Sequence, residues 1–218
     1  MGAGTIELRP GCLYVPGYLD REAQEALVAD LMRVVEAAPF FTPRMPRTGK
    51  PFSVRMTNCG ALGWVSDAAG GYRYQAMHPE TGAPWPPMPA LALRAWRDLA
   101  PEAAIAEACL VNHYLLDARM GLHRDEDEED VSAPVVSLSL GDTAVFRIGG
   151  TSRKDATRSI KLQSGDAVVL GGESRLAFHG VDRIIAGSST LLSGWPPGGG
   201  RLNLPLRRVR RTGSGEFR

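Results

Sequence analysis

Residues 112–127 read Asn-His-Tyr-Leu-Leu-Asp-Ala-Arg-Met-Gly-Leu-His-Arg-Asp-Glu-Asp. Within this stretch His123 and Asp125 are two positions apart, and on an extended strand such residues point to the same face. An imidazole nitrogen and a carboxylate could therefore bind one metal ion. A distant histidine, His179, would complete a two-histidine, one-carboxylate triad, which is typical of non-heme Fe(II) oxygenases. Because an H-x-D tripeptide often arises by chance, the remaining sequence must support the site.

Length and composition are those of a globular protein. The chain has 218 residues, enough for one domain with a sizeable core, and is 44% hydrophobic and 22% charged with a net charge of +1. No apolar run reaches the roughly 20 residues of a membrane span, and the N-terminus lacks the apolar segment of a signal peptide. The three cysteines are widely spaced, which argues against a disulfide framework or a cysteine zinc site. We therefore expect a cytoplasmic protein.

The first half of the chain predicts two helices separated by a loop and by segments of β character. Apolar residues at helical spacing predict helices over 20–37 and 91–99. Segment 39–55 combines four prolines with four basic residues and predicts an ordered loop, either a solvated surface or a phosphate contact. Segment 56–74 places aromatic residues beside glycines, which suits a hairpin that lines a pocket or a half-exposed sheet face.

From about residue 109 the pattern is β. Short apolar runs separated by turn residues predict strands at 109–116, 134–140, 143–149, 158–162, 166–171, 176–179, 189–195 and 202–207. Such a series without helices between its members predicts a mainly β (α+β) fold, a two-sheet jelly roll of the cupin kind that holds a ligand at its mouth. We expect one integrated domain, with an N-terminal extension over 1–108, a core over 109–209 and a basic, fraying tail over 210–218.

Arg201, Asn203 and Arg207 alternate with leucines, so they share one face of the last predicted strand. Two buried guanidinium groups are costly without anions, and a dicarboxylate would suit them because arginine forms bidentate pairs with carboxylates. Asn112 and Tyr114, on one face of an earlier strand, could add hydrogen bonds. The alternative is a basic edge strand that only prevents aggregation.

His179 precedes a glycine at a strand end, so its ring can face inward, although a lone histidine there is often structural. Asp127 continues the alternation of His123 and Asp125 and should lie beside the metal. The other acidic residues of this run predict a solvated turn: Glu126, Glu128, Glu129 and Asp130.

These motifs together resemble the AlkB family of Fe(II)- and 2-oxoglutarate-dependent nucleic-acid dealkylases, bacterial branch. The resemblance extends from about Tyr14 to Val209 and rests on Asn112-x-Tyr114, His123-x-Asp125-x-Asp127, Gly-Gly-Glu-Ser-Arg before His179, Arg201-x-Asn203-x-x-x-Arg207, and Met56-Thr57-Asn58-Cys59-Gly60 with Gly63-Trp64. It implies a double-stranded β-helix with an N-terminal nucleotide-recognition lid.

The resemblance also implies a role for each site residue. Fe(II) would be held by His123, Asp125 and His179, which are also the catalytic set. The cosubstrate 2-oxoglutarate would be held by Asn112, Tyr114, Arg201, Asn203 and Arg207. The substrate would be held by Met56, Thr57, Trp64, Tyr72, Asp127 and Arg153, with the flipped base between Trp64 and His123. The chain departs from the bacterial pattern at Leu170, Leu202 and Pro205.

The implied activity is oxidative demethylation of bases such as 1-methyladenine and 3-methylcytosine. The enzyme, a monomer, would use O2 and 2-oxoglutarate, release succinate, CO2 and formaldehyde, and act on alkylated DNA, preferably single-stranded, or on RNA. Two alternatives stay open. The same oxygenase could act on RNA or a protein side chain. Alternatively, a cupin-like barrel could bind a ligand or a redox-inert metal and produce no succinate.

Overall fold

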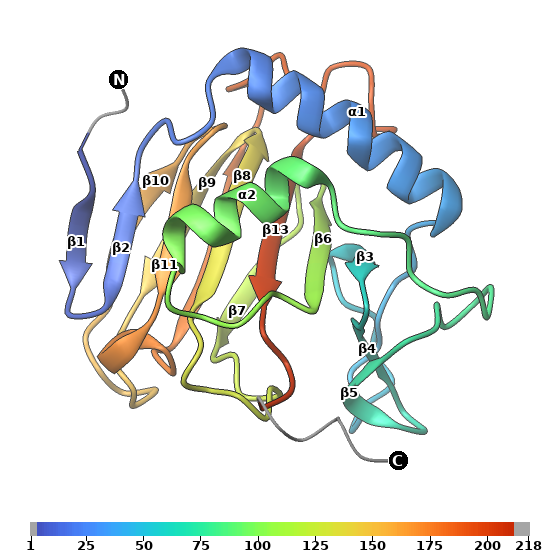
Figure 1. The fold of residues 1–218 in the computed structure, drawn as a ribbon, viewed down its shortest axis with the longest axis horizontal. Helices are drawn as coiled ribbons and strands as arrows, with labels where there is room; N and C mark the ends of the chain where they lie inside the picture. Colours follow the sequence, from blue (N-terminus) through green and yellow to red (C-terminus); the bar gives the residue numbers. More distant parts are fainter. Residues whose placement is uncertain (1–3, 212–218) are drawn as a thin grey trace.

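The computed structural model describes residues 4–211, which fold into two facing β-sheets, a separate hairpin and two helices (Figure 1). The helices are α1 (Arg21–Ala37) and α2 (Ala90–Leu99), with a short 3-10 turn η1 (Gly172–Ser174). The strands are β1 (Ile6–Arg9), β2 (Cys12–Val15), β3 (Arg55–Gly60), β4 (Gly63–Asp67), β5 (Gly71–Gln75), β6 (Ala108–Tyr114), β7 (Met120–His123), β8 (Val135–Gly141), β9 (Thr143–Ile148), β10 (Arg158–Leu162), β11 (Ala167–Leu170), β12 (His179–Ile185) and β13 (Arg201–Arg207).

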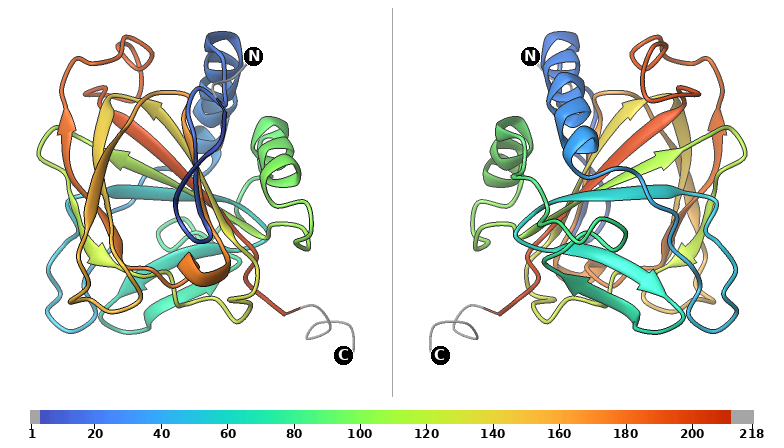
Figure 2. Two further views of the ribbon diagram at one scale, coloured as in Figure 1. Left: turned by 90° about the vertical axis from the view of Figure 1, so that its left-hand side faces the viewer. Right: turned by 90° about the vertical axis from the view of Figure 1, so that its right-hand side faces the viewer.

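The two main sheets form the jelly roll that the strand pattern predicts. The major sheet has seven strands in the order β1-β2-β11-β8-β13-β6-β3, and the minor sheet has four in the order β10-β9-β12-β7. All pairs between these strands are antiparallel. The side views show both helices on one side of the barrel and the minor sheet on the other (Figure 2). The mainly β fold class is therefore confirmed.

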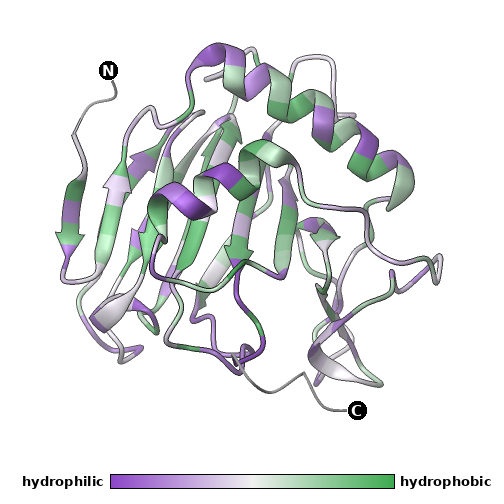
Figure 3. Ribbon diagram, in the orientation of Figure 1, coloured by the Kyte–Doolittle hydropathy of each residue, from purple (hydrophilic) through white to green (hydrophobic). Residues whose placement is uncertain are grey.

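Both predicted helices are present and cover the outer face of the major sheet. Helix α1 begins after Asp20, whose carboxylate accepts a hydrogen bond from the Ala23 N–H at 2.9 Å and so caps the helix. Leu27, Leu31 and Val34 follow at helical spacing and are buried. Figure 3 shows the helices mixing polar and apolar residues around strands that are mostly apolar. Neither helix of the described residues is long and apolar enough to cross a membrane.

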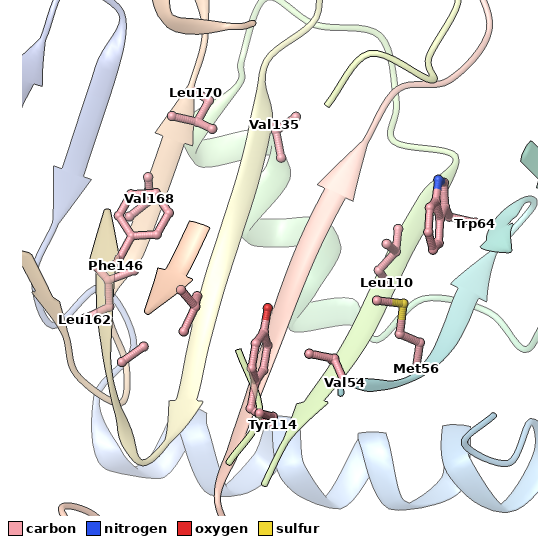
Figure 4. Close-up of a cluster of buried hydrophobic side chains, with 14 of the residues drawn as sticks. Val54, Met56, Trp64, Leu110, Tyr114, Val135, Phe146, Leu162, Val168 and Leu170 are labelled. Carbon is pink, nitrogen blue, oxygen red and sulfur yellow. The ribbon is translucent and has the colours of Figure 1, made fainter. Parts of the chain in front are cut away.

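The central strands of the major sheet are buried on both faces, and strand alternation divides their side chains between two cores. On β13, Leu202, Leu204 and Leu206 are fully buried and pack in the cluster beneath the helices. Arg201 and Arg207, at the intervening positions, face the space between the sheets. The inner cluster contains residues such as Val135, Phe146, Leu162, Val168 and Leu170, gathered around one side of the barrel (Figure 4). The interior of the barrel thus combines an apolar wall with the charged side chains of β13.

Three features of the fold differ from the sequence expectation. Strands β1 and β2 extend the major sheet, although their four-residue segments carry no clear pattern and β1 is partly exposed. Residues 189–195 form turns rather than a strand, because the buried Asp142 carboxylate accepts from the backbone of Gly187 and Ser189 and holds this loop. The strand expected at 176–179 begins only at His179, after the 3-10 turn.

The segment after β13 is anchored as far as Arg210, which corrects the expectation that the tail frays from its first residue, Arg210. The Val209 and Arg210 N–H groups donate to Glu107 Oε2 at 3.1 and 2.7 Å. The Arg210 and Arg208 guanidinium groups form ion pairs with the same carboxylate at 2.5 and 3.4 Å. Residues 212–218 of the predicted tail lie outside the described residues.

The Glu107 anchor should make stability depend on pH. Burial alone would raise the pKa of Glu107, but the hydrogen bonds from Arg210 and Val209 outweigh burial and hold the pKa below its ordinary value. A carboxyl group with a lowered pKa in the folded state stabilises the fold above its unfolded pKa, and this contribution is lost as pH falls through the folded pKa. Glu107→Gln should therefore unfold at a lower urea concentration than the wild type at neutral pH. The difference should shrink as pH falls through the lowered folded pKa of Glu107. A difference that is constant with pH would contradict this account.

Candidate active site

Strands β7 and β12 bring the two predicted histidine ligands together. The strands pair antiparallel with His123 directly opposite His179. A side chain at position 180 would prevent this approach, because a Cβ on Gly180 would lie 2.5 Å from the Met120 carbonyl oxygen. Asp125 lies just beyond the end of β7, in irregular chain. The expectation that the strand continues to Asp127 is therefore wrong, although Asp125 does converge with both histidines.

Backbone contacts fix the orientation of both imidazole rings. The Nδ1 atoms lie 2.9 and 3.0 Å from the carbonyl oxygens of Gly121 and Ala177. Because a carbonyl can only accept, each Nδ1 carries the proton and each Nε2 keeps its lone pair. The Nε2 atoms of His123 and His179 lie 3.8 and 3.7 Å from the two carboxylate oxygens of Asp125. The potential ligand atoms of all three residues lie within 4.8 Å of one another.

The electrostatics of the triad suit a divalent cation. Burial, with the neighbouring His123 acting in the same direction, lowers the pKa of His179 to about 4, so the His179 ring is neutral at physiological pH. Burial alone would raise the pKa of Asp125, but the charges of Arg207 and the two histidines hold it well below the ordinary range. Two imidazole nitrogens with an ionised carboxylate form the donor set that is typical of non-heme Fe(II).

A cavity of about 60 Å³ lies next to the triad. One of its lining side chains, Arg201, is a cation without a protein counter-ion. The Arg201 guanidinium is buried and donates to Ser139 Oγ at 2.7 Å and to two backbone carbonyls. Within residues 4–211 it forms no ion pair with a carboxylate, and its Nε has no partner. Burial lowers the pKa of Arg201 only to about 10, so it stays charged. Such a site requires an anion.

The rest of the cavity wall combines polar and apolar groups, which suits a small dicarboxylate. Asn112 and Tyr114 line it from β6, and Asn112 Oδ1 has no partner among the described residues. Asn203 lines it from β13, while the opposite wall is apolar and includes Leu170. Strand β13 lies between β8 and β6, so the alternative of a basic edge strand is wrong. Pro205 also lines the cavity, whereas Leu202 points to the helix side.

Arg207 differs from Arg201 because it already has protein anions. Its Nη2 lies 2.7 Å from Asp125 Oδ1, and its Nη1 lies 2.9 Å from Glu128 Oε1. Arg207 therefore orients the carboxylate of Asp125. Its Nε has no partner within the described chain, so one N–H remains for an anion in the cavity.

An outer pocket of about 510 Å³ adjoins the cavity at the triad. Trp64 and Tyr72, from the hairpin β4–β5, stack with ring centroids 5.6 Å apart and planes 19° from parallel. The Trp64 Nε1–H donates to the Asp127 carboxylate at 2.8 Å. Arg153 donates to the Leu122 carbonyl at 2.8 Å and lies at the same pocket. His123 and Asp125 line both spaces, so a molecule in the outer pocket would reach two members of the triad.

A model of the 2OG-Fe(II) oxygenase superfamily matches residues 11–207. The "Alpha-ketoglutarate-dependent dioxygenase AlkB homolog" of Caulobacter vibrioides is 55% identical to this chain, over 96% of it and 93% of the relative. The chain belongs to the AlkB family. It is an Fe(II)- and 2-oxoglutarate-dependent dioxygenase that uses O2.

Further similarities support the AlkB assignment. The "Alpha-ketoglutarate-dependent dioxygenase AlkB" of Salmonella typhimurium is 42% identical over 93% of this chain and 92% of its own length. A solved structure, "The structure of OsALKBH1", superposes with a TM-score of 0.77 and 30% identity, covering 94% of this chain and 100% of that one. The resemblance to the AlkB family, first apparent from separate motifs, is thus confirmed over 96% of the chain.

The AlkB site contains residues that sequence reasoning assigned elsewhere. Glu128, predicted to lie in a solvated turn, is completely buried and accepts from Arg175 Nη2 at 3.0 Å as well as from Arg207. Arg175 also donates to the Asp125 carbonyl at 2.7 Å. Arg175 ends the Gly-Gly-Glu-Ser-Arg motif, so the sequence offers a signal for its role in the site. By contrast, nothing in the sequence distinguishes Glu128 from its exposed neighbours Glu126 and Glu129.

Other predicted contacts divide between the two faces of β3. Met56 lines the outer pocket. Thr57 is fully buried on the opposite face, where its hydroxyl donates to the Ala38 carbonyl at 2.7 Å, so its assignment to the substrate pocket is corrected.

His78 and His113 lie outside the triad and contact the carbonyl oxygens of Pro39 and Gly199, each at 2.8 Å.

Proposed function

We propose that this AlkB-family dioxygenase removes alkyl groups from N-alkylated nucleobases in DNA and accepts RNA as a second substrate. The observation that carries the proposal is the adjacency of three features: the triad, the unpaired Arg201 in an enclosed cavity, and an aromatic pocket with an acidic residue. A relative from Schizosaccharomyces pombe that is 40% identical over 48% of this chain and 37% of its own length is named a tRNA demethylase. This name supports the choice of nucleic acid over peptide.

Each part of the site would take one component. The Nε2 atoms of His123 and His179 and the carboxylate of Asp125 would hold Fe(II). Arg201 would bind one carboxylate of 2-oxoglutarate, with the cavity completed by Asn112, Tyr114, Asn203 and Arg207. When bound, these groups supply oxidative chemistry: with O2, 2-oxoglutarate becomes succinate and CO2, the N-alkyl carbon is hydroxylated, and the product collapses to formaldehyde and the free base. The chain contributes orientation and exclusion of water.

The outer pocket would receive a base that has been turned out of its strand. We propose that segment 39–75 is the recognition lid, with Met56, Trp64 and Tyr72 providing apolar contact. A base such as 1-methyladenine or 3-methylcytosine carries a positive charge, which favours the indole face of Trp64 and the carboxylate of Asp127. Because flipping costs less when pairing is weak, damaged or single-stranded DNA should be preferred.

We propose that exposed basic residues of the lid contact the backbone of the nucleic acid. Arg44, Arg47, Lys50 and Arg55 lie in or just after the loop that borders the outer pocket, and all four are exposed. They would contact phosphates, so binding should weaken as salt increases. All the proposed ligands come from one chain, and we propose that the enzyme acts as a monomer.

Formaldehyde and succinate release test the function directly. The purified chain, with Fe(II) and 2-oxoglutarate, is incubated with matched methylated single-stranded DNA, the same DNA as a duplex, methylated RNA and a methylated peptide. Release from the nucleic acids, greatest for single-stranded DNA, is expected. A clear preference for the peptide would contradict the substrate class, and the absence of substrate-coupled succinate would indicate a barrel that only binds ligands.

Asp127→Asn should reduce the preference for cationic lesions. The substitution keeps the shape and the acceptor for the Trp64 N–H but removes the negative charge. Hydrogen bonds to charged groups contribute more binding free energy than neutral ones. Loss of the charge should therefore lower kcat/KM for 1-methyladenine and 3-methylcytosine about tenfold. The neutral lesions 1-methylguanine and 3-methylthymine serve as the internal control and should change much less. An equal loss on both classes would show that Asp127 does not read charge.

A further inference from the structure

Tyr74 links the lid hairpin to the interior of the barrel. It lies on β5, whose only sheet partner is β4, so the hairpin is not part of either main sheet. The Tyr74 hydroxyl accepts from Arg207 Nη1 at 2.8 Å and donates to Glu128 Oε1. Burial raises the pKa of Tyr74 well above its ordinary value, so the phenol keeps the proton that it donates. Trp64 and Tyr72 of the same hairpin line the outer pocket.

Behind Tyr74 lies a closed network of four buried charges. Arg207 pairs with Asp125 and Glu128, and Arg175 pairs with Glu128. Two carboxylates and two guanidinium groups balance, and hydrogen bonds in such a buried environment are strong and directional. A shift of the Arg207 guanidinium would therefore be felt at Tyr74, because they share one hydrogen bond.

Arg207 is also the member of this network that an incoming anion would contact. It lines both the cosubstrate cavity and the outer pocket, and its Nε–H has no partner among residues 4–211. A carboxylate in the cavity would take this N–H and restrict the guanidinium. Because Arg207 Nη1 donates to the Tyr74 hydroxyl, a restricted guanidinium would also hold that hydroxyl more firmly.

We propose that Tyr74 is a positioning residue that couples occupancy of the cosubstrate cavity to the order of the lid hairpin through Arg207 and Glu128. The inference rests on the proposed function for the identity of the cosubstrate cavity. When 2-oxoglutarate binds, the hairpin is held more firmly and the aromatic wall of the base pocket is completed. Coupling between two sites is reciprocal, so a base in the outer pocket should also tighten the binding of 2-oxoglutarate.

Amide hydrogen exchange on the full chain tests this coupling without turnover. The protein is loaded with Mn(II), which replaces Fe(II) without oxidation chemistry, and exchange is measured with and without saturating 2-oxoglutarate. Three proteins are compared: wild type, Tyr74→Phe, and Tyr14→Phe. Tyr14→Phe is the matched control because Tyr14 also donates to a carboxylate, Asp166 at 2.9 Å, but on β2, outside the site. Calorimetry measures 2-oxoglutarate affinity on the same samples, and thermal unfolding verifies that each variant is folded.

The expected result is that 2-oxoglutarate slows exchange of the β4 and β5 amides about fivefold in wild type and Tyr14→Phe, the effect of about one hydrogen bond. In Tyr74→Phe the protein should still bind 2-oxoglutarate, but the hairpin protection should be absent. Equal protection in Tyr74→Phe and wild type, or none in wild type despite binding, would overturn the proposal while leaving the function intact. Failure of wild type to bind 2-oxoglutarate would overturn both.

Discussion

Replacing Asp125 with alanine should reduce formaldehyde release from methylated single-stranded DNA by at least about 100-fold. Substitution of groups that only orient metal ligands already costs about 10–100-fold, and Asp125 would be a direct ligand. It supplies the only carboxylate among the described residues whose oxygens lie within 4 Å of both His123 and His179 Nε2. Its removal also takes one of two counter-ions from Arg207. Both effects weaken the metal site.

The measurement needs a control for folding and a readout apart from turnover. Asp30→Ala removes a carboxylate from the surface of α1, where it pairs with Arg33, and a surface pair of this kind contributes about 0–1 kcal/mol. This variant should keep wild-type activity and Mn(II) affinity. Asp125→Ala should lose Mn(II) binding while unfolding cooperatively. Retained metal affinity in Asp125→Ala would show that the triad is not the metal site.

The parts of the site that the sequence predicted are those encoded by local periodicity. Period-two alternation was enough to assign Arg201, Asn203 and Arg207 to one face and the leucines to the other, and the buried cores agree. The same reasoning paired Asn112 with Tyr114. The meeting of His123 and His179 depends instead on the register of β7 against β12, which no local pattern reveals. Here the resemblance to a family supplied what periodicity could not.

Where local reasoning was wrong, a tertiary contact outweighed the local pattern. Asp125 was placed on a continuing strand, but Arg175 binds its carbonyl and holds the chain in an irregular loop. Glu128 was expected in solvent because acidic runs are usually solvated. Two guanidinium groups from distant segments stabilise its burial, and their positions are visible only in the fold. The same alternation places Thr57 opposite Met56 and so predicts that it points away from the pocket, as the structure shows.

Glu128→Gln should be the most destabilising single substitution among the acidic residues that follow Asp125. The side chain has no exposed surface and is the counter-ion that Arg175 and Arg207 share. Glutamine preserves the volume but removes the charge. Its amide N–H₂ would also face a guanidinium donor of Arg175 or Arg207 where an oxygen now accepts. Removal of one partner from a buried ion pair leaves an uncompensated charge and costs about 3–5 kcal/mol in the free energy of unfolding. Urea denaturation at neutral pH measures this loss.

Glu129→Gln is the matched control, because the substitution is chemically identical and the neighbouring residue is exposed. It should change the free energy of unfolding by less than about 0.5 kcal/mol. If both variants were equally stable, the network behind Arg207 would be dispensable to the fold. If Glu128→Gln alone is destabilised, the acidic run that follows Asp125 contains one structural carboxylate among solvated ones. The loop that presents Asp125 to the metal would then owe its conformation to Glu128 and the two arginines that it neutralises.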